Sequence, residues 1–125
     1  MRKTNKPTAE QEIYIAVKLY LENVKTYASS LNDIAVKLAE NVKKIPYQYE
    51  GEEEDRELLL SDLGEVQRDS AELLSISTKL YNDEIEGAEF VRSGEKMVSL
   101  KARCEKLAKK LSLPIKTIEE AGGGL

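Results

Sequence analysis

The chain of 125 residues is 41% hydrophobic and 34% charged, with a formal net charge of −4, which suits one soluble domain. It has one cysteine and no histidine, which excludes an intramolecular disulfide, a histidine-based catalytic pair and the common histidine-containing zinc and di-iron sites. It has no run of 18 apolar residues and no signal-peptide core, so we expect a single cytoplasmic domain over residues 1–125, with residues 1–7 and 122–125 flexible.

The first 45 residues predict one long helix. Thr8 and Gln11 have the spacing of a capping box, which places the helix start near Ala9, and Pro46 marks its end because the residue before a proline is pushed out of the α region. The apolar pattern continues across residues 29–33, so we expect a continuous helix of about 55 Å. Two apolar series repeat every seven residues: Val17, Val24, Leu31, Leu38, Ile45 and Ile13, Tyr20, Tyr27, Ile34.

A second helix is predicted from about Glu53 to Tyr81. The acidic run at residues 52–55 suits a helix start, where carboxylates meet the positive end of the helix dipole. Ser70 and Ser77 complete a narrow apolar stripe and would let another helix approach closely. The apolar members of this stripe are Leu59, Leu63, Val66, Leu73 and Leu80.

The next apolar series starts at Phe90, ten residues after Leu80 instead of seven. This offset fits either a stammer inside one very long helix or a reversal of the chain, and Gly87 favours the reversal. A third helix would then begin at Asp83 or only after Gly94. Its expected packed residues are Met97, Leu100, Cys104, Leu107 and Leu111.

Together these patterns predict an all-α fold, an antiparallel three-helix bundle with long coiled-coil-like helices and a short C-terminal helix from Ile115 to Ala121. Cys104 falls on an apolar stripe, so we expect a buried thiol that acts as a small hydrophobe. If the shorter helices align with the N-terminal half of the first, its far end overhangs and offers an apolar strip to a partner, with tyrosines as further anchors. The predicted interface residues are Tyr14, Ile34, Leu38, Val42, Ile45, Tyr47 and Tyr49.

Charge is distributed in blocks along the chain. Residues 1–49 carry a net charge of +3, residues 50–89 of −11 and residues 90–125 of +4. These blocks have two interpretations. Either they select pairing and orientation within the bundle, or a surface that stays uncovered binds a partner of opposite charge.

Four carboxylates lie on the second helix at Asp62, Glu65, Asp69 and Glu72. The last three are spaced i, i+4 and i+7 and could converge on a hard cation such as Mg²⁺. They border the apolar seam, and no second acidic helix supplies facing ligands. We therefore interpret them as a solvated face and expect no metal and no cofactor.

The segment Leu107–Ile118 resembles the helix-turn-helix of DNA-binding proteins, with Ala108 at the small position of its first helix and Leu111 and Leu113 on either side of the turn. It departs from that pattern in having Ser112 where glycine is usual and two glutamates in the second helix. The resemblance implies nucleic-acid contacts by Lys109, Lys110, Lys116 and Thr117.

The sequence thus predicts a non-enzymatic interaction or assembly protein, an adaptor, inhibitor or accessory factor that works through helix–helix contacts with another protein or a second copy of itself. A small DNA-binding regulator using residues 107–121 is the alternative. We expect no membrane association.

Overall fold

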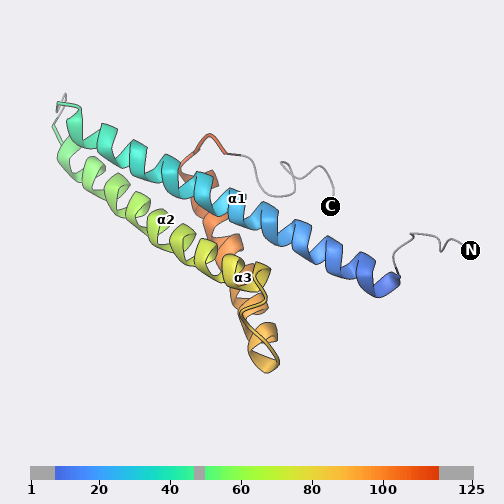
Figure 1. Cartoon of the computed structure of the whole chain (residues 1–125). Coiled ribbons are helices and arrows are strands. Elements are labelled where there is room, and N and C mark those ends of the chain that lie inside the picture. Colours follow the sequence, from blue (N-terminus) through green and yellow to red (C-terminus); the bar gives the residue numbers. More distant parts are fainter. Residues whose placement is uncertain (1–7, 47–49, 116–125) are drawn as a thin grey trace, which may run out of the picture.

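A computed structural model describes residues 8–46 and 50–115 and shows an all-α three-helix bundle. Helix α1 covers Ala9–Lys44, α2 covers Glu52–Tyr81 and α3 covers Ala88–Lys110. Helices α1 and α2 lie side by side and antiparallel, whereas α3 crosses them at a steep angle (Figure 1). Within the described ranges, no helix is long and apolar enough to cross a membrane.

Helix α1 begins where the sequence predicts and runs without a break. The Thr8 hydroxyl accepts a hydrogen bond from the Gln11 amide at 3.2 Å, and the Gln11 side chain accepts one from the Thr8 amide at 2.9 Å. Ile45, directly before the proline, is extended and caps the helix. The capping box and the single continuous helix are both confirmed.

Helices α2 and α3 are separate, as the reversal interpretation predicts. Two hydrogen bonds close the end of α2, from the Asp83 amide to the Leu80 carbonyl at 3.3 Å and from the Glu84 amide to the Lys79 carbonyl at 3.0 Å. This is a Schellman motif, and Asp83 takes the left-handed conformation that it requires, with φ +58°. Helix α3 then starts at Ala88, which differs from both predicted starts.

The predicted small-residue seam is confirmed, because Ser70 and Ser77 are fully buried. The Ser77 hydroxyl donates to the Leu73 carbonyl of its own helix at 2.7 Å. The Asn32 amide of α1 donates to the Gln67 carbonyl at 3.0 Å and to the Ser70 hydroxyl at 3.1 Å. These two bonds can form in only one alignment of α1 against α2, so they help to set the register of the pair.

The hydrophobic core combines one stripe from each helix. Its α3 members include Met97, Leu100 and Cys104, which confirms the packed residues predicted from the sequence, while Leu107 and Leu111 pack against it half-buried. From α1 and α2 the core takes Leu21, Val24, Tyr27, Ala28, Leu31, Ala35, Ala39, Leu63, Val66, Leu73 and Leu80.

Three ion pairs join α2 to α3. Lys96 lies 2.7 Å from Glu72, Arg103 lies 3.1 Å from Asp69, and Lys110 lies 3.3 Å from Asp62. The three basic residues are spaced by seven, so they follow one stripe of α3 as it crosses acidic α2. The contacts agree with the interpretation that charge blocks orient helices within the bundle. They also correct the expectation of a solvated acidic face, because Asp69 is buried at 7% exposure.

The C-terminal end of α3 is a second Schellman motif. The Ser112 amide donates to the Lys109 carbonyl at 3.1 Å, and the Leu113 amide donates to the Ala108 carbonyl at 2.9 Å. Ser112 has φ +51°, the conformation that glycine usually provides there, and Leu113 is buried beside the helix that it ends. The predicted helix from Ile115 to Ala121 lies outside the described residues except for Ile115.

Removing the guanidinium at the Asp69 contact should cost measurable stability. We expect Arg103→Met to lower the free energy of unfolding by about 1 kcal/mol, because it leaves a buried carboxylate without its cation. Arg92→Met is the matched control, since Arg92 pairs with Glu89 on an exposed surface within α3 and should change stability by less than about 0.5 kcal/mol. Urea denaturation of both variants measures the difference, and equal effects would contradict the account.

Candidate functional site

The first turns of α1 extend beyond the end of α2 (Figure 1). This overhang is apolar, yet it is exposed: its large hydrophobic side chains are between 41% and 65% accessible. They lie on several sides of the helix, which shows that no single neighbour covers this part of α1. The exposed residues are Ile13, Tyr14, Ile15, Val17 and Leu19.

The overhang is therefore at the opposite end of α1 from the one expected. Ile34 and Leu38 pack against the core, because α2 and α3 cover α1 from about Leu21 onward and leave its first turns uncovered. Val42 and Ile45 line a smaller hollow of about 210 Å³ beside the start of α2. Tyr14 lies on the observed overhang, and Tyr47 and Tyr49 lie outside the described residues.

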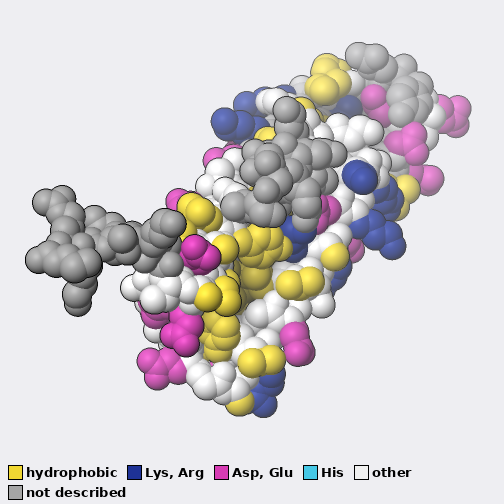
Figure 2. All heavy atoms as spheres, turned by 90° about the vertical axis from the view of Figure 1, so that its right-hand side faces the viewer, with side chains coloured by type: hydrophobic (Ala, Val, Ile, Leu, Met, Phe, Trp, Pro, Cys, Tyr) yellow, Lys and Arg dark blue, Asp and Glu magenta, His cyan; other side chains and the backbone are white. Residues whose placement is uncertain are grey.

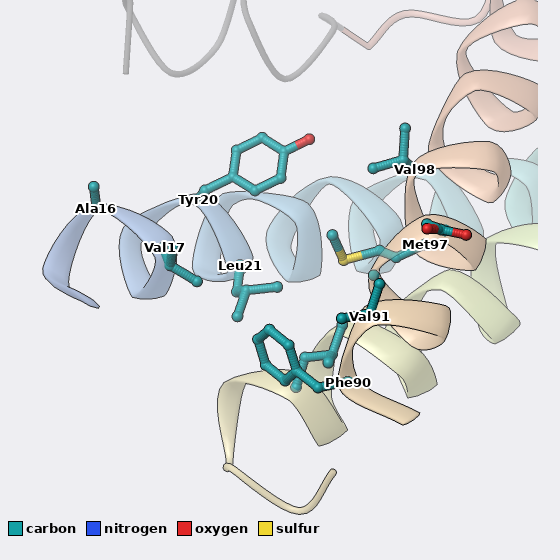
Figure 3. A pocket seen from close by; sticks show the side chains of 11 residues that line it. Ala16, Val17, Tyr20, Leu21, Phe90, Val91, Met97 and Val98 are labelled. Carbon is teal, nitrogen blue, oxygen red and sulfur yellow. The ribbon is translucent and has the colours of Figure 1, made fainter. Parts of the chain in front are cut away.

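A larger groove opens next to the overhang, between the N-terminal halves of α1 and α3, with a volume of about 690 Å³. Figure 3 shows the side chains that form it, with Phe90 and Met97 of α3 pointing toward Leu21 of α1. The groove is lined by Ala16, Val17, Tyr20 and Leu21 of α1, Leu80 of α2, and Phe90, Val91, Gly94, Glu95, Met97 and Val98 of α3.

The groove has a buried floor and exposed walls. Leu21, Leu80 and Met97 are each 5% exposed or less, so the floor belongs to the hydrophobic core. Phe90, Val91 and Val98 on the α3 wall are between 43% and 59% exposed. Figure 2 shows the resulting strip of hydrophobic side chains on this face, with acidic side chains along one edge. Such a continuous apolar surface on a charged protein is typical of an interaction site.

Gly94 leaves an opening in the α3 wall. A Cβ atom added there would meet no atom within 4 Å, so the glycine is not needed for packing inside the chain. A helical glycine is about 1 kcal/mol less favourable than alanine. The missing side chain gives another molecule direct access to the α3 backbone.

A polar cluster fixes the opposite side of the overhang to the end of α2. The Lys18 ammonium lies 3.1 Å from the Asp83 carboxylate, which also accepts a 3.3 Å hydrogen bond from the Tyr14 hydroxyl. Lys18 also donates to the Tyr81 carbonyl at the C-terminal end of α2, where a cation is favourable. The Tyr81 ring lies 4.8 Å from Lys18 and 4.4 Å from the Lys25 ammonium.

The environment of Lys18 stabilises its charged form. Desolvation alone would lower the pKa of the ammonium, but hydrogen bonds to Asp83 and Tyr14 and the charge of Asp83 outweigh it and raise the pKa above its ordinary value. The Lys18 ammonium therefore keeps its charge at neutral pH and links the α1 overhang to the end of α2.

The other predicted sites are distributed over the structure. Lys109 is exposed, Lys110 is paired with Asp62, and Lys116 and Thr117 lie outside the described residues. Of the four carboxylates considered as cation ligands, Asp62, Asp69 and Glu72 form ion pairs with α3. No group of metal-ligating side chains suited to an ion occurs among residues 8–46 and 50–115.

The sequence interpretation missed Val91 and Val98 as site residues. They are seven residues apart, which is the same signal that identified the core stripes. Ser93 and Gly94 interrupt the apolar series between Phe90 and Met97, and this interruption favours a packed stripe that begins only at Met97. Val91 and Val98 form a second apolar series beside Phe90 and Met97, and this series indicates a wider apolar face on α3.

No protein-family model, curated protein or solved structure matches the chain. The function of the chain is therefore inferred from its surface.

Cys104 should behave as a buried thiol and not as a reactive one. Burial, with the nearby Asp69 charge, raises the pKa of the Cys104 thiol to about 12. In the native protein at pH 8 we expect no reaction with a thiol reagent such as DTNB, and full reaction in denaturant. Because the unfolded thiol ionises at lower pH than the native one, stability should fall as the pH rises above about 9. Rapid native labelling would contradict this assignment.

Proposed function

We propose that this chain is a non-enzymatic interaction or assembly protein that binds a helix of another protein, or of a second copy, in the groove between α1 and α3. The observation that carries the proposal is the exposed apolar wall above a core floor, formed by Val17, Phe90, Val91 and Val98. An amphipathic helix laid in such a groove would bury its apolar face there.

The chemistry of the groove supports binding more than catalysis. Among its lining residues, Glu95 is the only charged side chain and Tyr20 the only other polar one. A general acid and base would need at least two positioned titratable groups near a substrate. The groove is also open to solvent, whereas small-ligand pockets enclose most of their ligand.

Photo-crosslinking from the groove tests the proposal. A photoreactive phenylalanine analogue at Val91 should give discrete cross-linked products in lysate of the source cell, and a Val98→Asp change should abolish them. Leu58 of α2 is the matched control position, because it is 66% exposed compared with 59% for Val91 but lies outside the groove. Products of equal yield from both positions, or none from Val91, would reject the groove as the binding site.

The two helical glycines provide a separate test that distinguishes stability from binding. Gly94→Ala and Gly64→Ala should each raise the free energy of unfolding by up to about 1 kcal/mol, since neither new Cβ meets an atom within 4 Å. Only Gly94 lines the groove, so only Gly94→Ala should weaken cross-linking from Val91. Thermal denaturation measures the first effect. Equal cross-linking in both variants would contradict close approach of a partner at Gly94.

A further inference from the structure

We propose that the partner helix is amphipathic and basic, with lysine or arginine residues flanking its apolar face. This inference rests on the proposed function and adds the chemistry of the partner. It follows from the dimensions of the groove and from the charges that surround it.

The α3 wall fits about two turns of a partner helix. From Phe90 to Val98 it covers eight residue steps of α3, or about 12 Å along the helix axis. Anchors at positions i, i+3 or i+4, and i+7 of a partner helix span about 10.5 Å. The groove thus has room for three apolar anchors in one row, and Gly94 lets one of them approach the α3 backbone.

Acidic residues predominate around the groove. Residues 9–21 and 82–98 contain seven acidic and three basic side chains. All three basic side chains form ion pairs within the chain, namely Lys18–Asp83, Arg92–Glu89 and Lys96–Glu72. Among the described residues, five carboxylates of these two segments are left without an ion pair: Glu10, Glu12, Glu84, Glu86 and Glu95.

Two of these carboxylates lie on the two helices whose side chains form most of the groove. Glu95 lines it from α3. Glu10 is on α1, three residues before Ile13 and seven before Val17, which places it on the same face of that helix. A helix in the groove therefore lies beside Glu95, and its extension along α1 would approach Glu10, so cationic residues at its flanks would complement both carboxylates.

The same charges disfavour other occupants. A second copy would bring the same uncompensated carboxylates to the interface, and like charges repel. An anionic lipid surface would be repelled for the same reason. An amphipathic helix with basic flanks is the partner whose binding these carboxylates favour.

Selection from a peptide library tests the inference with the full chain. The library displays 16-residue helical peptides with leucine fixed at positions i, i+4 and i+7, and with flanking positions randomised among lysine, glutamate and glutamine. Selection on the wild-type chain should enrich lysine at the flanks, and selection on the Val91→Asp variant should enrich no peptide. At 50 mM salt the best peptide should bind at least tenfold more tightly than a counterpart in which glutamate replaces each flanking lysine. At 500 mM salt, where charges are screened, the dissociation constants of the two peptides should differ by no more than about threefold.

Variants of the chain locate the charge effect. Glu10→Gln and Glu95→Gln should each weaken the basic peptide two- to fivefold at low salt. Glu65→Gln is the matched control, because Glu65 is exposed on α2 outside the groove and should have no effect.

The outcomes separate the two proposals. Enrichment that depends on Val91 but has no lysine preference, or prefers glutamate, would overturn the basic partner and leave the groove as a binding site. No difference between wild type and Val91→Asp would overturn both. A dimer of the chain alone in sedimentation, lost in Val91→Asp, would overturn the basic partner in favour of a second copy.

Discussion

Helix α1 is longer than the helix that pairs with it, and the arrangement of the surface depends on this mismatch. With 36 residues against 30, α1 is about 54 Å long and α2 about 45 Å at 1.5 Å per residue. The Asn32 bonds to Gln67 and Ser70 fix the register between them. Since α2 starts close to the C-terminal end of α1, the excess length has to appear at the N-terminal end.

The position of α3 turns this overhang into one wall of a groove. The pairs from Lys96, Arg103 and Lys110 attach α3 to acidic α2, while Cys104 and Leu100 fill the core between them. At its start α3 diverges from the other two helices, as Figure 1 and Figure 3 show. Phe90 and Val91 consequently face the overhang across open space, above a floor that the core already provides. Charge pairing inside the bundle and the proposed binding surface are thus parts of one arrangement.

Much of the fold could be predicted from local patterns. The capping box at Thr8, Pro46, the seven-residue repeats and the ten-residue offset before Phe90 identify three helices and their reversals, because these signals depend on neighbouring residues in the chain. The overhang could not be placed in this way. Which end of α1 stays uncovered depends on register, and that is set by a contact between Asn32 and Ser70, 38 residues apart.

The site was therefore only partly predictable. The sequence predicts Tyr14 as an interface anchor, and Tyr14 lies on the overhang. The heptad series, however, does not distinguish exposed Ile13 and Val17 from buried Val24 and Leu31. Likewise, Asp69 and Glu95 are both acidic residues on helices, and only the position of α3 decides that one pairs with Arg103 and the other lines the groove. Periodicity shows which residues share a face, and the steep crossing of α3 decides which part of that face is covered.

The central claim is that the first turns of α1 and of α3 contribute little to the core and are kept accessible for a partner helix. Amide hydrogen exchange of the full chain, with and without a helical peptide that binds it, tests this claim most directly. The account predicts fast exchange in residues 9–17 and 88–94 of the chain alone, and slowing confined to these two segments when the peptide is added. Core-level protection of both segments before the peptide is added, or slowing that maps to the C-terminal half of α1, would contradict it.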